Sequence, residues 1–219
     1  CLPEETIEYF KNIFHKFDTS VNQIICSSYA KAKNYEENFP LNENISFIDI
    51  GFNKTSIITY INNKMSGLTV LPVGGNHITK DISKVLKINL EQAEHIKINF
   101  NKNENVLNNE DFSLALLQKI IFARSEEILN MCTQSIKLNS TIKSPYNIIL
   151  MGEGSKILNN QYKDKISTVH SLNFLEETTE NVCNAGFKLG KRLNRQEVIV
   201  VPKKQIKQGF FEKFFHFFD

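Results

Sequence analysis

The sequence of 219 residues lacks several features that mark specialised protein classes. Its four cysteines, Cys1, Cys26, Cys132 and Cys183, stand singly, with no Cys-x-x-Cys and no His at metal-ligand spacing. This scatter excludes a zinc module and a disulfide scaffold and is typical of a reducing cytosol. No signal peptide opens the chain, and no apolar run approaches the ~20 residues that cross a bilayer. We therefore expect any membrane contact to be peripheral.

A strong charge of one sign is also absent. Lys and Arg total 26 and Asp and Glu total 24, which gives a net charge of +2. No basic run with interleaved aromatic residues occurs in the body of the chain, so we expect no nucleic acid as partner. Hydrophobic residues make up 41% of the chain, enough for the core of one large domain or two small ones. Because the chain begins with Cys1 and enters a helical pattern almost at once, we expect a fragment without its N-terminal part.

Apolar spacing predicts the elements of the first third of the chain. It predicts a helix over residues 4–17, a buried strand over 21–25 and a short helix over 27–33. Three strand-like runs follow between Ile45 and Pro72: ISFIDI, TSIITYI and KMSGLTVLP. Asn62 and Asn63 tolerate the positive φ of a tight turn, so the last two runs are predicted to form a hairpin within an antiparallel meander.

Helical spacing dominates after this meander. Helices are predicted over NHITKDISKVL, over LEQAEHIKI and, after an Asn-rich loop at 99–109, over residues 111–135. The long helix is predicted to bury one stripe, formed by Phe112, Leu116, Ile120, Ala123, Ile128 and Cys132. NIILMGEGS predicts a strand followed by a glycine loop that opens a helix. Residues 178–193 are predicted to form the last helix of the body.

The glycines are concentrated at a few junctions. Of nine in the chain, five (Gly51, Gly74, Gly75, Gly152 and Gly154) lie where a strand gives way to a turn or a helix. Glycine at such points lets backbone amides approach an anion, although it also serves ordinary turns. The order of these junctions carries more information than any one of them.

That order resembles the second half of the actin-like ATPases, and within them the bacterial cell-division family FtsA. The resembling segments are FIDIGFNKTSI, VLPVGGNHITKDIS, LEQAEHIK, RSEEIL and ILMGEGS. The second segment is the most specific, since Pro72, Gly74, Asn76, Thr79, Asp81 and Ile82 all fit the family. The resemblance implies an α/β, actin-like (ribonuclease H-like) fold, of which this chain is the second half with closing elements of the first domain.

The resemblance also divides the chain. It implies that 1–34 end the first domain, 45–175 form the second with a helical subdomain inserted at about 73–138, and 176–193 return to the first domain. Residues 194–208 would be a linker and 209–219 an amphipathic membrane-targeting helix.

A site for ATP and Mg²⁺ follows from the same resemblance. Its residues would be Asp49, Gly51, Asn53, Lys54, Thr55, Gly75, Glu94, Lys97, Gly152, Gly154 and Ser155. Asp49 would orient the magnesium through water, and Gly51 and Thr55 would present donors to the phosphates. Glu94 and Lys97, one helical turn apart, would reach the ribose. From the residues alone, this last pair would be interpreted as a solvated ion pair.

The chain departs from the family pattern in both glycine loops. Phe52, Asn53 and Lys54 stand where the family has two glycines and a threonine, and Phe52 would be strained if the loop needs a left-handed residue there. Lys54 supplies a cation that could replace lost amide contacts. Glu153 replaces a glycine and would repel a phosphate unless it turns outward. We therefore expect weakened nucleotide binding and at most a weak ATPase.

The C-terminal segment GFFEKFFHFFD has a different character. On a helical wheel one half holds Phe210, Phe211, Phe214, Phe215, Phe217 and Phe218, and the other half is polar. A helix of ~10 residues is only ~15 Å long, so it would lie on a membrane and not span it. Docking on the protein core or on a partner is the alternative. Lys203, Lys204 and Lys207 would be attracted to an anionic lipid surface, which favours the membrane.

Arg124 and Glu127, at i and i+3 on the long helix, are by themselves compatible with an exposed ion pair. The resemblance implies that this pair receives the C-terminal peptide of FtsZ. It further implies a protein that tethers FtsZ filaments to the cytoplasmic face of the cell membrane at the division site and assembles into actin-like, ATP-dependent filaments. The alternatives are a pilus-assembly actin-like ATPase and a kinase or chaperone ATPase of the same superfamily, neither of which explains the aromatic end.

Overall fold

The computed structural model describes residues 3–21, 23–38, 44–100, 113–139, 147–158 and 172–193. In chain order the elements are α1 (Glu4–His15), α2 (Ser27–Tyr35), η1 (Glu36–Asn38), β1 (Ile45–Ile50), β2 (Thr55–Ile61), β3 (Lys64–Leu71), α3 (Gly75–Leu86), α4 (Leu90–Asn99), α6 (Leu114–Asn139), β4 (Asn147–Met151), η2 (Glu153–Ile157), β5 (Leu172–Phe174) and α8 (Thr179–Leu193). The linker 194–208, the aromatic segment 209–219, Phe112 and most of the predicted loop 99–109 lie outside the described residues. No helix in the described ranges is long and apolar enough to cross a membrane.

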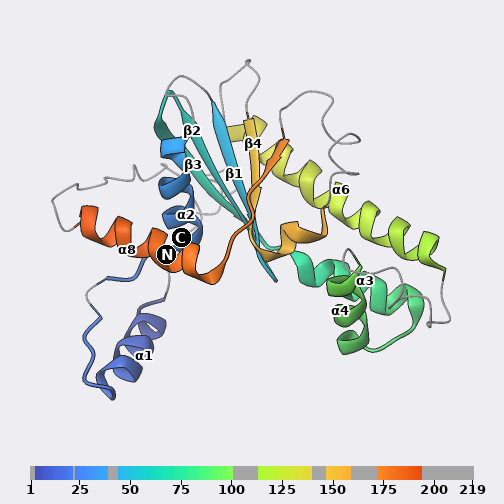
Figure 1. The fold of residues 1–219 in the computed structure, drawn as a ribbon, viewed down its shortest axis with the longest axis horizontal. Helices are drawn as coiled ribbons and strands as arrows, with labels where there is room; N and C mark the ends of the chain where they lie inside the picture. The colour runs from blue at the N-terminus through green and yellow to red at the C-terminus, as the bar shows by residue number, and fades with distance from the viewer. Residues whose placement is uncertain are drawn as a thin grey trace, which may run out of the picture.

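One mixed sheet organises the molecule, with strand order β3-β2-β1-β4-β5 (Figure 1). β1 pairs antiparallel with β2, which pairs antiparallel with β3, so the predicted meander is confirmed. The hairpin turn between β2 and β3 places Asn62 at φ 48° and Asn63 at φ 61°, the left-handed conformation predicted for them. On its other side β1 runs parallel to β4, and β4 parallel to β5. β5 was not predicted, because three residues give too short an apolar pattern.

β1 is buried on both faces because helices cover both sides of the sheet. Ile48 and Ile50 point into the core formed with α3, α4 and α6. Ile45 and Phe47 point the other way, into a smaller core that contains Ala32 of α2. Since side chains alternate along a strand, Asp49 belongs to the α2 side. This alternation decides what the carboxylate of Asp49 can contact.

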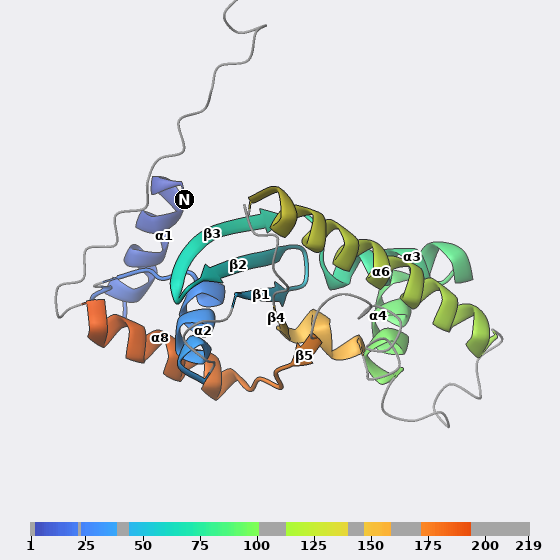
Figure 2. The same cartoon turned by 90° about the horizontal axis from the view of Figure 1, so that it is seen from above.

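The helical layer is formed by α3 and α4, which lie at one end of the sheet, and by α6, which runs from beside α3 back along β2 and β3 (Figures 1 and 2). The long helix is confirmed, but its predicted stripe is wrong in its first half: Leu116 is 41% exposed and Ala123 is exposed. The residues that α6 buries are Leu117, Ile121, Ser125, Ile128, Leu129, Cys132 and Ile136. These recur at spacings of three and four, so the helix is rotated by about one residue from the prediction.

At the other end of the sheet α2 packs against α8 through Ala30, Ala185 and Leu189. α1 buries no residue and stands apart from the sheet in both views (Figures 1 and 2). The predicted strand at 21–25 is wrong: its described residues form no strand, and Ile24 is 41% exposed. A strand needs a neighbouring strand to which its backbone can hydrogen-bond, and this segment lies beside helices instead.

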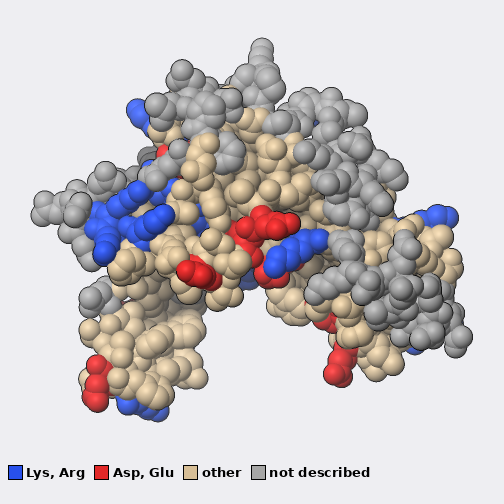
Figure 3. All heavy atoms as spheres, in the orientation of Figure 1, with Lys and Arg blue, Asp and Glu red and all other residues tan. Residues whose placement is uncertain are grey.

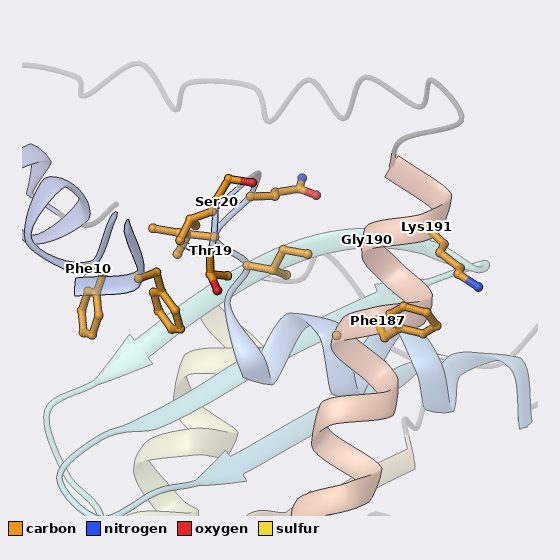
Figure 4. A pocket seen from close by; sticks show the side chains of 12 residues that line it. Phe10, Thr19, Ser20, Phe187, Gly190 and Lys191 are labelled. Atoms are coloured by element: carbon orange, nitrogen blue, oxygen red, sulfur yellow. The ribbon is translucent and has the colours of Figure 1, made fainter. Parts of the chain in front are cut away.

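An open apolar groove of about 670 Å³ lies between α1, the segment 19–25 and α8 (Figure 4). Phe10 and Phe14 line it from α1, and Phe187, Gly190 and Lys191 from α8. Phe187 is 63% exposed and Phe10 45% exposed, so these rings are available to a further apolar surface.

Candidate functional site

A cavity of about 320 Å³ lies where the β1–β2 loop, the start of α3, the end of α4 and η2 meet. Its lining consists of Gly51, Phe52, Gly75, Ile78, Glu94, Lys97, Ile98, Glu153, Gly154, Lys156 and Ile157. The cavity thus brings together Gly51, Gly75, Glu94, Lys97 and Gly154, five of the residues predicted to bind a nucleotide, from four separate segments. A volume of this size is at the lower end of small-molecule sites.

Six other predicted residues, Asp49, Asn53, Lys54, Thr55, Gly152 and Ser155, are not in this lining. The lining also contains Phe52 and Glu153, which the sequence analysis named only as departures from the family pattern, and Ile78, Ile98, Lys156 and Ile157, which were not predicted. The apolar members gave no signal of their own, because a lining isoleucine follows the same helical spacing as a core isoleucine.

The β1–β2 loop closes on itself through a hydrogen bond from the Gly51 amide to the Lys54 carbonyl, 2.9 Å. The Thr55 hydroxyl donates to the Val73 carbonyl at 2.7 Å. Both donors that were predicted to face a phosphate are therefore used inside the protein in this conformation. Neither Phe52 nor Asn53 has a positive φ, so the strain predicted for Phe52 is wrong. The turn forms without a left-handed residue, and a glycine at position 52 is not required.

The first turn of α3 is fastened to this loop. The amides of Gly75 and Asn76 donate to the carbonyls of Gly51 (2.9 Å) and Phe52 (2.7 Å). The close approach depends on Gly74, because a Cβ there would lie 2.8 Å from the Phe52 carbonyl oxygen and 3.0 Å from the Lys54 amide nitrogen. Two of the amides that a helix start offers to an anion are thereby satisfied by the chain itself.

Glu94 and Lys97 form the polar wall of the cavity. The Lys97 ammonium lies 2.7 Å from Glu94 Oε2 and donates to Thr79 Oγ1 (2.8 Å) and to the Gly75 carbonyl (3.2 Å). The Thr79 hydroxyl in turn donates to Glu94 Oε2. The Lys97 side chain is only 11% exposed, so the solvated pair expected from the residues alone is wrong. This network joins α4 to the first turn of α3. The Phe52 ring lies 5.9 Å from the Lys97 ammonium, at the outer limit of a cation–π contact.

The β4–η2 turn borders the cavity on the opposite side. Gly152 has φ +90°, and a Cβ there would overlap Asp49 Oδ1, so only glycine fits. Ser155 donates its hydroxyl to the Gly152 carbonyl at 2.7 Å, which tightens the turn. Glu153 points outward, with its side chain 78% exposed and paired with Lys156 at 2.7 Å. Figure 3 shows acidic and basic side chains next to one another on this part of the surface.

Asp49 lies behind the cavity in a buried ion cluster with Lys31 and Glu177. The Lys31 ammonium is 2.8 Å from Asp49 Oδ2 and 2.9 Å from Glu177 Oε2. Glu177 Oε2 also accepts the Gly152 amide at 3.0 Å. Burial, followed by the neighbouring Glu177 carboxylate, raises the pKa of Tyr35, which keeps this phenol neutral. Neither Lys31 nor Glu177 was predicted, since each is isolated in the sequence and meets Asp49 only in the fold.

No group of three or more His, Cys, Asp or Glu able to hold a metal ion occurs among the described residues. Asp49 is the residue that was predicted to orient magnesium, and its carboxylate is engaged by a lysine.

A second polar feature lies on the outer face of the helical layer. Arg124 of α6 binds both carboxylate oxygens of Asp81 on α3, at 2.5 and 3.1 Å, and Glu127 at 2.7 Å. The hydrogen bonds that Arg124 donates to Asp81 raise the pKa of Arg124, so the guanidinium stays charged. Arg124 therefore does more than form the expected intrahelical pair, because it joins α3 to α6.

Comparison with known proteins adds to this geometry. Residues 46–204 match the family model described as "Cell division protein FtsA", a stretch that contains the sheet, the cavity and the α3–α6 face. The chain belongs to the FtsA family. Over 170 residues it is 27% identical to the cell division protein FtsA of Streptococcus pneumoniae, covering 71% of this chain and 37% of that protein. The Bacillus subtilis FtsA is 30% identical over 126 residues, 51% of this chain and 29% of the relative.

Among solved structures, the crystal structure of MreB 5 of Spiroplasma citri bound to AMPPNP superimposes with a TM-score of 0.66 at 16% identity. The match covers 89% of this chain and 66% of that one. At this identity the likeness shows the fold alone, and it confirms the predicted actin-like α/β architecture. The chain spans about a third of the length of these curated FtsA relatives.

Proposed function

We propose that this member of the FtsA family links FtsZ filaments to the cytoplasmic face of the membrane at the division site. The observation that carries this proposal is the segregation of six phenylalanines from the polar residues between Phe210 and Asp219. Partial burial of six such rings in lipid, each worth roughly 1.5–3 kcal/mol when fully buried, outweighs the cost of ordering a short helix. One helix would bind weakly, and many copies on a filament firmly.

The charge on α8 supports the same proposal. Lys188, Lys191 and Arg192 are exposed near its end, and Figure 3 shows basic side chains gathered over this helix. With Lys203, Lys204 and Lys207 they form a basic stretch before the aromatic segment. Anionic lipid would attract this stretch by about 1 kcal/mol for each cation near the surface.

Sedimentation with vesicles tests the membrane part. The chain should co-sediment with phosphatidylglycerol vesicles, and a chain ending at Gly209 should stay in the supernatant. Phe214→Glu with Phe215→Glu should abolish binding, whereas a Lys213→Gln control, on the polar half, should retain most of it. Equal sedimentation of the truncated and complete chains would remove the membrane role.

We also propose that the cavity between α4 and η2 accepts the nucleoside part of ATP. Glu94 lines the cavity with a carboxylate that is 31% exposed and would accept hydrogen bonds from ribose hydroxyls, with Lys97 holding it in place. Gly154 lines the opposite side of the cavity, where the base would lie. The phosphates would extend toward the β1–β2 loop, where Lys54 is exposed. Because two α3 amides and the Gly51 amide already have partners, this chain should bind ATP weakly. Calorimetry that gives micromolar affinity would contradict that expectation.

For the FtsZ C-terminal peptide we propose the α3–α6 face around Arg124 and Glu127. Arg124 is a poor position to test, because it also holds Asp81 of the neighbouring helix. Glu127 is better suited, since its side chain is 54% exposed and, within the described residues, it forms an ion pair with Arg124 alone. Glu127→Lys should weaken binding of an FtsZ tail peptide in fluorescence anisotropy by roughly tenfold. Unchanged affinity would remove this assignment of the α3–α6 face.

A further inference from the structure

Lys31 is a cation placed inside the protein between two carboxylates. It projects from α2, and its side chain is only 7% exposed. Asp49 approaches from the end of β1 and Glu177 from the segment after β5, at 2.8 and 2.9 Å from the ammonium. Three elements far apart in the sequence therefore converge on one ammonium group.

The sheet register explains this convergence. Asp49 points to the α2 side because Phe47, two residues earlier, does so. Glu177 is fixed on the same side by the Gly152 amide, 3.0 Å from Oε2. Two carboxylates this close to one another would be costly to bury without a positive charge between them. The Lys31 ammonium supplies that charge.

A divalent cation fits poorly at Asp49 in this arrangement. Oδ2 of Asp49 is taken by the ammonium, and Oδ1 faces Gly152 so closely that a Cβ there would overlap it. A magnesium ion bound through either oxygen would also lie near the fixed positive charge of Lys31. The expected role of Asp49 in orienting magnesium is thus in conflict with its surroundings.

We propose that the Lys31 ammonium takes the place of a divalent cation beside Asp49, so that a nucleotide in the neighbouring cavity would bind without Mg²⁺ held by Asp49. The lysine offsets the Asp49 charge that would otherwise repel a polyphosphate tail. The phosphate part of the proposal rests on the nucleotide binding proposed above. The metal part concerns the folded chain alone.

Thermal unfolding of the complete chain, with Mg²⁺ or EDTA and without nucleotide, tests the metal part. The unaltered chain should have the same Tm in both. Lys31→Met keeps the length of the side chain and removes its charge, so its Tm in EDTA should fall by roughly 10 °C and recover in part with Mg²⁺. Adding Asp49→Asn should abolish this response to Mg²⁺. Lys84→Met, an exposed lysine of α3, is the matched control and should behave as the unaltered chain.

Mn²⁺ binding followed by electron paramagnetic resonance gives a second measurement, and it uses the metal alone. Asp49→Asn should not change the amount of Mn²⁺ bound by the otherwise unaltered chain. Lys31→Met should bind one additional Mn²⁺, and adding Asp49→Asn should remove it. A Mg²⁺-dependent rise in Tm of the unaltered chain that Asp49→Asn abolishes would overturn the proposal. If Lys31→Met does not fold even with Mg²⁺, the Mn²⁺ comparison of the unaltered and Asp49→Asn chains decides. Failure of ATP to bind would leave these results intact and would refute only the nucleotide proposal.

Discussion

Lys97 is the residue at which stability and the candidate site are most directly linked. Lys97→Met keeps the aliphatic stem of the side chain but removes three hydrogen bonds, to Glu94, Thr79 and the Gly75 carbonyl. The Thr79 hydroxyl still donates to Glu94, and Glu94 is 31% exposed, so water can solvate its carboxylate. The net cost should then be that of one well-placed, charge-assisted contact, about 2 kcal/mol.

Urea unfolding followed by circular dichroism measures this cost. Lys156→Met is the matched control, since Lys156 also lines the cavity but its pair with Glu153 is exposed on both sides. An exposed pair contributes about 0–1 kcal/mol, so the control should lose clearly less. Glu94→Gln combined with Lys97→Met should show a coupling energy above about 0.5 kcal/mol.

Equal stability of Lys97→Met and Lys156→Met would refute this prediction. That result would mean that the buried network between α3 and α4 contributes no more than a surface ion pair. The wall of the cavity would then not be preorganised, and the ribose contact proposed for Glu94 and Lys97 would lose its support.

Three other single contacts can be tested by substitution. Arg124→Glu places a carboxylate against Asp81 and Glu127 and should lower the free energy of unfolding by roughly 2 kcal/mol, whereas Glu127→Ala should lower it by less than about 1 kcal/mol. Equal losses in urea unfolding would contradict the bridging role of Arg124. Gly152→Ala should cost roughly 2–4 kcal/mol, because a Cβ at φ +90° would overlap Asp49, and calorimetric melting at an unchanged Tm would disprove it. Burial raises the pKa of the Cys132 thiol from 9.0 to about 12. Above the unfolded value only the unfolded chain releases this proton, so stability should fall by up to about 1.4 kcal/mol per pH unit between these values, and Cys132→Ala should remove that slope.

The repeating parts of the fold could be predicted from the sequence because their signals are local. The three strands of the meander depend on short apolar or alternating runs, and the turn depends on Asn62 and Asn63, which tolerate positive φ. Neighbouring positions decide both signals. The segment 21–25 was predicted wrongly for the same reason. A short apolar run has no information on whether a strand lies beside it, and this one lies against helices.

The candidate site could be predicted only in part. The glycines and the Glu94–Lys97 spacing were visible in the sequence, and the cavity brings Gly51, Gly75, Gly154 and that pair together. The residues that form ion pairs with Asp49 and Arg124 in the fold were not visible in the sequence. Lys31 pairs with Asp49 across 18 residues and with Glu177 across 146, and Asp81 pairs with Arg124 across 43. Contacts of this range are set by how the helices cover the sheet.

The hydrogen bonds from the first turn of α3 to the β1–β2 loop have a mechanical consequence. A ligand that pulls on the carbonyls of Gly51 or Phe52 must either break these bonds or carry α3 with it. The second half of the same helix contains Asp81, which forms an ion pair with Arg124 on α6. α3 thus connects the cavity proposed for the nucleoside with the face proposed for FtsZ, so a displacement of the β1–β2 loop would be transmitted along this helix to Arg124.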